Sequence, residues 1–225
     1  QYPRDVEVNG LGTDVLRLGI PFAQGLLQEV PVPAEDLLLA GELNTEFNLL
    51  ASELTQSAGH ASGVVEAAEK ARSLRGEIVR QGADTVHLHL EQSLIRSAVA
   101  AVESLREYFA DDSIVVPLDD EVASTGVQLA EAQIDAGSMT NATALLGELL
   151  PWSSRFDQIE TLDQQCYETF RQRLAEGQWN ESIEQYQALA AVAPDEPRTS
   201  DYSNELFSTA TNEIESLLSA SELDR

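Results

Sequence analysis

The stretch GQWNESIEQYQALAAVAPDEP, residues 177–197, has the features of one complete helix with a defined start and a defined end. Its apolar residues recur three or four positions apart, which is the spacing of one face of an α-helix. These residues are Ile183, Tyr186, Leu189 and Val192. Gly177 can end a preceding helix and turn the chain, and Pro194 cannot continue a helix. The stretch therefore predicts the second half of a helical hairpin.

Helical spacing also dominates the rest of the chain, and convincing alternation with a period of two residues is nearly absent. We therefore predict an all-α fold of antiparallel helical hairpins. Gly82 is expected to end one helix and Asp84 to cap the next, which carries the strongest apolar stripe and runs to Phe109. Later helices are expected at 119–136, 139–150, 155–176, 178–192 and 201–220.

The segment DDSIVVPLDD, residues 111–120, interrupts this pattern with acidic and β-branched residues. We expect a solvated linker, with Asp119 or Asp120 capping the helix that follows. Carboxylates can also bind calcium, but the segment lacks the spacing and the central glycine of an EF-hand loop. The sequence thus predicts two helical regions, 1–115 and 116–225, which could also form one continuous domain.

The charge of the chain limits its partners. Its 225 residues include 39 acidic and 13 basic ones, which gives a net charge of -26. Nucleic acid and anionic membranes are therefore unfavourable partners, because their phosphates bind Lys and Arg. A basic polypeptide is the partner that this charge favours.

The single cysteine, Cys166, excludes an internal disulfide, and we expect it to be a core residue. No apolar run is long enough for a membrane span. The chain begins with Gln1 rather than Met, which fits a mature protein that has lost a signal peptide. We expect an exported protein, periplasmic or extracellular, with the cytoplasm as the alternative.

Residues 163–197 resemble a tetratricopeptide repeat, a helical hairpin that binds other proteins. The residues that carry the resemblance are Leu174, Gly177, Trp179, Ser182, Ile183, Tyr186, Leu189, Val192 and Pro194. Residues 123–151 are a weaker echo, in which Gly137 corresponds to Gly177. These two glycines are 40 residues apart, whereas the family repeats every 34 residues or so. The resemblance implies a bundle that passes into a short tetratricopeptide-like array over residues 123–197.

In such repeats the first helix of each pair lines a concave groove that holds a partner. The resemblance places Ser124, Val127, Gln128 and Glu131 there from the weaker unit, and Gln164, Tyr167, Glu168 and Arg171 from the stronger one. Tyr and Arg are favoured at binding hot spots, so Tyr167 and Arg171 are the leading candidates. The resemblance thus implies a non-catalytic protein that binds or assembles polypeptides.

Two other interpretations of the function remain open. The first is a helical domain that binds a small ligand or a metal through its N-terminal half. His87 and Glu91, four residues apart, share a helical face, and His60 could supply a third ligand. The second is a structural spacer. The sequence has no phosphate-binding loop, nucleophile elbow or haem site, so we expect neither an enzyme nor a bound cofactor.

Overall fold

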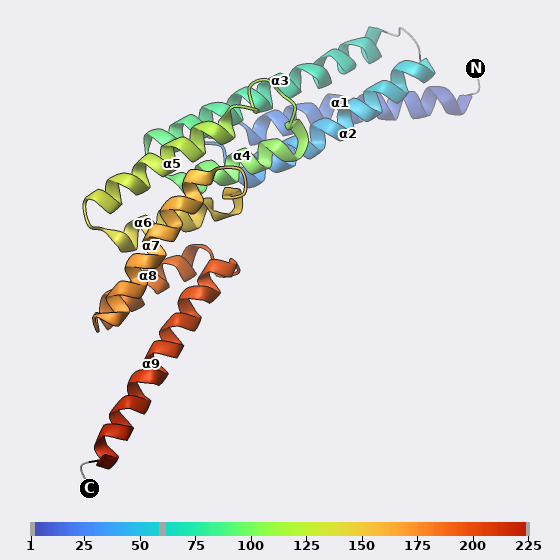
Figure 1. Cartoon of the computed structure of the whole chain (residues 1–225). Helices are drawn as coiled ribbons and strands as arrows, with labels where there is room; N and C mark the ends of the chain where they lie inside the picture. The colour runs from blue at the N-terminus through green and yellow to red at the C-terminus, as the bar shows by residue number, and fades with distance from the viewer. Residues whose placement is uncertain (1–2, 59–61, 224–225) are drawn as a thin grey trace. The chain divides into compact units, whose positions relative to one another are not determined.

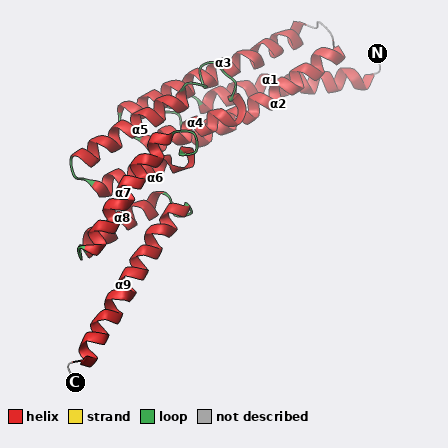
Figure 2. Ribbon diagram, viewed as in Figure 1, coloured by secondary structure: helices red, strands yellow, loops and turns green. Residues whose placement is uncertain are grey.

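The computed structural model describes residues 3–58 and 62–223, and these residues confirm the all-α prediction (Figures 1 and 2). They form nine α-helices and one short 3-10 helix, and no strand. The α-helices are α1 (Pro3–Leu26), α2 (Ala34–Ala58), α3 (Ser62–Glu91), α4 (Ile95–Phe109), α5 (Leu118–Asp135), α6 (Met139–Leu149), α7 (Asp157–Ala175), α8 (Trp179–Val192) and α9 (Pro197–Leu223). The 3-10 helix is Leu150–Trp152.

The chain divides into two compact units, residues 1–122 and residues 123–225. The division falls inside α5, shortly after its first turn. Each unit has buried apolar side chains of its own. The two units are therefore described one after the other.

The first unit is built around α2 and α3, which pack against each other and against both α1 and α4. Two glycines let α1 approach α2 closely. A methyl group at Gly12 would lie 2.8 Å from Leu54, and one at Gly19 would lie 2.5 Å from Phe47. These two contacts also fix the helices as an antiparallel pair, because the residue number rises along α1 while it falls along α2.

The expected helix end at Gly82 is wrong. Helix α3 runs without a break to Glu91, and the chain turns at Ser93, whose φ is 58°. Gly82 faces α4 instead: a methyl group there would lie 2.5 Å from Cδ2 of the fully buried Leu105. The glycine therefore serves helix packing. Asp84 consequently lies inside α3 and caps nothing.

The acidic segment is only partly the solvated linker that the sequence suggested. Helix α5 begins at Leu118, and Asp119 is buried and forms an ion pair with Arg106. Arg75 binds Asp112 across 3.1 Å between Nη2 and Oδ2. Two of the acidic residues thus tie the segment between α4 and α5 to α3 and α4.

The second unit consists of packed helix pairs, an arrangement compatible with a helical repeat. Helix α6 packs against α7 and α8, and α9 packs against both α7 and α8. Gly137 and Gly177 occupy the turns after α5 and α7, each with φ of 75°, a conformation that glycine adopts without strain. In both turns the glycine N–H and the next N–H bond back to the end of the preceding helix. The turn predicted at Gly177 is confirmed.

Candidate functional site

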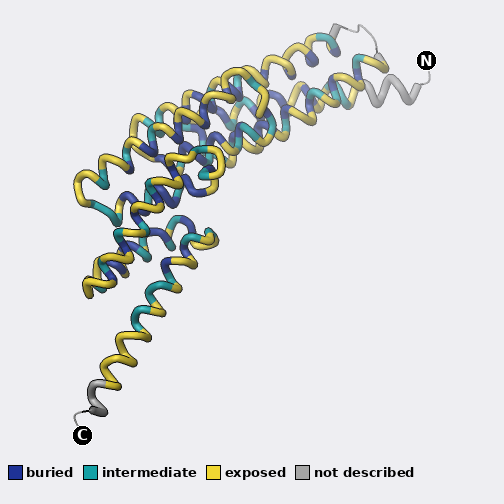
Figure 3. The backbone as a smooth tube through the Cα atoms, in the orientation of Figure 1, coloured by how far each residue is buried: buried dark blue, intermediate teal, exposed yellow. Residues whose placement is uncertain are grey.

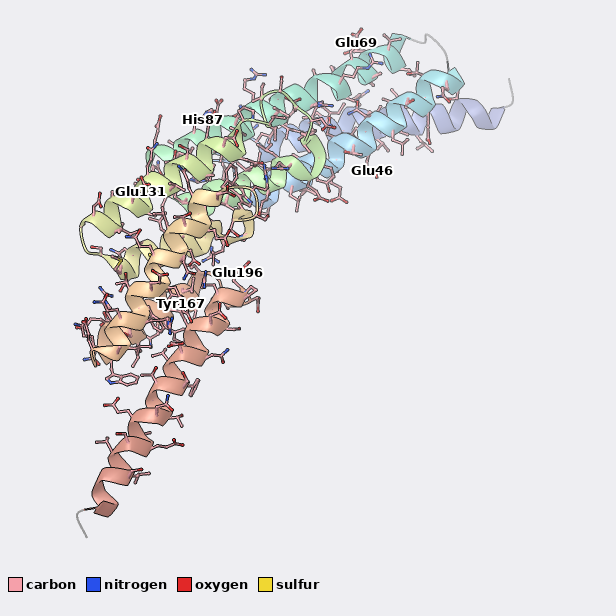
Figure 4. The ribbon with its side chains drawn as sticks, viewed as in Figure 1. Glu46, Glu69, His87, Glu131, Tyr167 and Glu196 are labelled. Atoms are coloured by element: carbon pink, nitrogen blue, oxygen red, sulfur yellow. The ribbon has the colours of Figure 1, made fainter. Side chains whose placement is uncertain are left out.

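Four of the eight residues that the resemblance places in the groove lie on α7. Gln164, Glu168 and Arg171 are exposed, and Tyr167 is half-buried (Figure 4 labels Tyr167). Nε2 of Gln164 donates a hydrogen bond to Glu168 over 3.1 Å. The four side chains therefore share one side of the helix, at a spacing of three or four residues.

Helix α9 lies against this side of α7 and fixes its side chains. Nε of Arg171 is 3.2 Å from Oε1 of Glu205. Arg198 donates hydrogen bonds to Asp163 and, over 3.1 Å, to Oε1 of Gln164. We call this surface the α7–α9 face: Gln164, Tyr167, Glu168 and Arg171 of α7 with Arg198 and Glu205 of α9.

Tyr167 is held from several sides. Its ring centroid lies 5.0 Å from that of Tyr202 and 6.1 Å from that of Phe170. The guanidinium carbon of Arg198 lies 4.9 Å above the Tyr167 ring, within range of a cation–π contact. Burial, followed by the charges of Glu205 and Asp201, raises the pKa of the Tyr167 hydroxyl. Tyr167 is thus a neutral aromatic side chain with a fixed orientation.

Gln128 and Glu131, which the resemblance also placed in the groove, lie exposed on α5 (Figure 4 labels Glu131). Gln128 bonds to Ser124 over 3.4 Å, so these two share a surface of the helix. Val127, which the resemblance placed in the same groove, is buried and does not belong to that surface. Among the described residues, no polar contact joins these α5 side chains to the α7–α9 face.

The sequence analysis did not identify Arg198 and Glu205, although their separation from residues of α7 could have indicated both. The bonds Arg171–Glu205 and Gln164–Arg198 each join residues 34 positions apart, and Asp163–Arg198 joins residues 35 apart. A tetratricopeptide repeat has this length. Stepping one repeat forward from α7 would have pointed to the start of α9.

The part of α9 from Phe207 to Ser219 is largely exposed (Figure 3). Phe207, Ile214 and Leu217 are each more than half exposed, and Phe207 reaches 72%. Their spacing of seven and three residues puts them on one side of the helix, and we call them the α9 row. Glu213 and Glu215 lie among them, and α9 has no basic residue after Arg198.

Behind the α7–α9 face, a buried glutamine joins four helices. Nε2 of Gln185 on α8 lies 2.9 Å from Oγ1 of Thr143 on α6 and 3.0 Å from the carbonyl oxygen of Cys166 on α7. The same nitrogen is 3.5 Å from the hydroxyl of Tyr202 on α9. Cys166 is fully buried, as expected, and burial raises the pKa of its thiol to about 11. This thiol is therefore protonated and poorly nucleophilic.

The histidines do not form the arrangement that was considered as an alternative metal site. Nε2 of His87 lies 3.0 Å from Oε2 of Glu121 on α5 rather than bonding Glu91. His60 lies outside the described residues. Among the residues that the structure describes, no group of three or more His, Cys, Asp and Glu side chains is placed to hold a metal ion.

A cleft of about 400 Å³ lies between α1 and α3. Its walls combine apolar side chains such as Ile20 with charged ones, among them Arg17 and Lys70. Nζ of Lys70 is 2.8 Å from Oε1 of Glu66, which also lines the cleft. The volume is within the range of small-molecule sites. The small-ligand interpretation of the sequence placed a site in the N-terminal half without identifying this cleft.

The sequence matches no protein-family model, and it has no match among curated proteins. Of the helices in the described ranges, none has both the length and the apolar character of a membrane span.

Proposed function

We propose that the chain is a non-catalytic protein that binds another polypeptide through its second unit. The binding surface comprises the α7–α9 face, the α9 row and the exposed residues Gln128 and Glu131 of α5. Polar contacts between α7 and α9 join residues that are 34 or 35 positions apart in the sequence. This separation supports the idea that the unit is a short tetratricopeptide-like array.

The observation that carries the proposal is the exposed α9 row. Phe207, Ile214 and Leu217 follow one side of a helix whose first turns are packed. Large apolar side chains that line up on a surface mark an interaction site more often than scattered ones do. A helix of the partner that lies along α9 would remove these side chains from water.

The α7–α9 face adds polar anchors to this apolar row. Tyr167 is fixed by Tyr202 and Arg198, and Arg171 is fixed by Glu205. Side chains that are already ordered lose little entropy on binding, and Tyr and Arg are favoured at hot spots. Exposed acidic residues around them favour a basic partner.

The test is affinity isolation of the full chain from its source cells, followed by native mass spectrometry of the eluted complex. The binding variant is Phe207→Ser/Leu217→Ser, which changes two exposed side chains without disturbing the core. The control is Ile114→Ser/Val116→Ser, which removes two exposed apolar side chains in the first unit. We expect a stoichiometric polypeptide that is lost in the binding variant and retained in the control. A bare chain, or a partner that the binding variant retains, would contradict the proposal.

The α1–α3 cleft supports a second candidate function, the binding of a small molecule by the first unit. Arg17 and Lys70 would face an anionic group of the ligand, and Leu16 and Ile20 an apolar part. Native mass spectrometry of the gently isolated protein would reveal a small adduct. The Arg17→Ala variant should then lose this adduct and keep any polypeptide partner.

A further inference from the structure

Helix α1 carries a second exposed apolar row, on a side that faces away from its core contacts. The row consists of Leu11, Val15, Leu18 and Phe22, spaced by four, three and four residues. All four are more than half exposed, and Leu18 reaches 73%. The buried residues of α1, among them Leu16, Ile20 and Ala23, form a separate row. Helix α1 is therefore apolar on two sides, and within the described residues one of these sides is left exposed.

The neighbouring helix α2 contributes to the same surface. Leu11 and Leu18 come immediately before Gly12 and Gly19, the α1 residues that touch α2. One residue back along a right-handed helix is a rotation of about 100°. On α2, the residues just before Phe47 and Leu54 are likewise rotated by about 100° from these contact residues. Because the helices are antiparallel, both rotations lead to the same face of the pair.

On α2 these positions are acidic. Glu46 and Glu53 precede Phe47 and Leu54, and Glu42 lies one turn before Glu46. All three are exposed, and none has an ion-pair partner in the part of the chain that the structure describes (Figure 4 labels Glu46). We call them the α2 acidic row. It runs beside the α1 row, and each row spans eleven residue steps, or about 16 Å.

The charges select the occupant of this surface. A second copy of the chain would bring one α2 acidic row against another acidic molecule, which is repulsive. Helices that lie on membranes carry Lys and Arg beside their apolar row, whereas glutamates stand here. A helix with an apolar stripe flanked by Lys or Arg satisfies both rows at once.

We propose that the α1–α2 face binds a basic amphipathic helix of another protein. The helix lies along the α1 row, with apolar residues at intervals of three and four over at least three turns. Its basic residues meet Glu42, Glu46 and Glu53. This site lies in the first unit and is separate from the surface proposed above on the second unit.

The test is fluorescence anisotropy with the full chain and a labelled synthetic 18-residue peptide. The peptide has Leu at helical spacing and Lys elsewhere. A scrambled peptide of the same composition measures attraction by net charge alone, and a Leu/Glu peptide with the same apolar stripe measures the role of the basic residues. We expect the amphipathic Leu/Lys peptide to bind at least tenfold more tightly than either control.

Three double variants locate the site. Leu18→Ser/Phe22→Ser should weaken binding of the Leu/Lys peptide at least tenfold, and Glu46→Gln/Glu53→Gln should weaken it about threefold or more and reduce its salt dependence. The matched control Ile114→Ser/Val116→Ser, which removes two exposed apolar side chains outside both proposed surfaces, should bind as the unchanged chain does. Since all of these positions are exposed, thermal unfolding of the variants should match that of the unchanged chain.

Several results would overturn the inference. One is equal binding of the scrambled peptide, and another is undiminished binding by Leu18→Ser/Phe22→Ser. A dimer in light scattering that this variant abolishes would identify a second copy as the occupant. Binding to phosphatidylcholine vesicles that this variant abolishes would identify a lipid surface. Because the proposed function is tested separately by Phe207→Ser/Leu217→Ser in the second unit, failure here leaves that result unaffected.

Discussion

Gln185 on α8 donates a hydrogen bond to Thr143 on α6 across 2.9 Å, and both side chains are shielded from solvent. The same amide also reaches the backbone of α7, through the carbonyl of Cys166, and its oxygen accepts a hydrogen bond from Arg173 over 3.3 Å. A buried amide must satisfy its donors and its acceptor, since an unpaired polar group in the interior costs free energy. Gln185 therefore holds the helices of the second unit in one relative position.

Replacing Gln185 with Ala should lower the free energy of unfolding by roughly 2–4 kcal/mol, because it leaves a cavity and removes the partners of Thr143 and Arg173. Urea titration followed by circular dichroism measures this change. Gln187→Ala, an exposed glutamine on the same helix, is the control and should change stability by less than about 0.5 kcal/mol. Equal effects of the two substitutions would show that the buried amide has no special role.

Two glycines of α3 should respond to alanine with opposite signs. Gly82→Ala should destabilise the first unit by about 1–3 kcal/mol, since the methyl group would overlap three atoms of Leu105. Gly76→Ala should stabilise it by roughly 0.5–1 kcal/mol, because nothing lies within 4 Å and alanine favours the helix. Thermal unfolding of the two variants checks the pair. A stabilising Gly82→Ala would mean that α3 and α4 are not closely packed there.

The thiol of Cys166 should be inert in the folded protein. It is buried and its pKa is raised to about 11, so almost none of it is thiolate at pH 8. We expect it to react with Ellman's reagent at pH 8 at least roughly a hundredfold more slowly than after unfolding in urea. Rapid labelling of the folded chain would place the cysteine at the surface.

His89 should make the first unit less stable in mild acid. Burial lowers the pKa of His89 below its ordinary value of 6.5, and its Nδ1 is buried without a hydrogen-bond partner. The unfolded chain therefore binds this proton more strongly than the folded chain does. The contribution of neutral His89 is fully present above pH 6.5 and is lost as the pH falls below that value.

The measurement compares urea unfolding of the unchanged chain and of His89→Gln at pH 8 and at pH 5. Between pH 8 and pH 5, the free energy of unfolding should fall more for the unchanged chain than for His89→Gln. A difference that does not vary with pH would mean that His89 has the same proton affinity in the folded and unfolded states.

The helical nature of the chain was predictable because apolar spacing reports directly on which side of a helix is buried. The end of α7 at Gly177 was also predictable, since the residues around it agree on a turn. The helix end predicted at Gly82 was wrong because glycine can indicate either of two things, a turn in the chain or the close packing of two helices. Only the neighbouring Leu105 distinguishes them, and it is more than twenty residues away.

The candidate site shows the same limit. The candidate residues of α7 could be named because a local motif contains them, whereas Arg198 and Glu205 belong to α9 and carry no motif of their own. Tyr167 was expected as a groove residue, and its packing against Tyr202 could not be foreseen without the position of α9. Contacts between helices depend on how the helices are placed, and a periodic pattern specifies only which side of each helix faces inward.

The distal part of α9 has a consequence for how binding could be followed in time. Every residue from 211 to 219 is exposed, so the backbone of this segment depends on its own helical hydrogen bonds. A segment of this length is only marginally helical in water. Its amide hydrogens should exchange with deuterated solvent within seconds in the free chain and far more slowly once a partner covers the helix. Deuterium uptake in this one segment would thus time the arrival and departure of the partner without a label or a substitution.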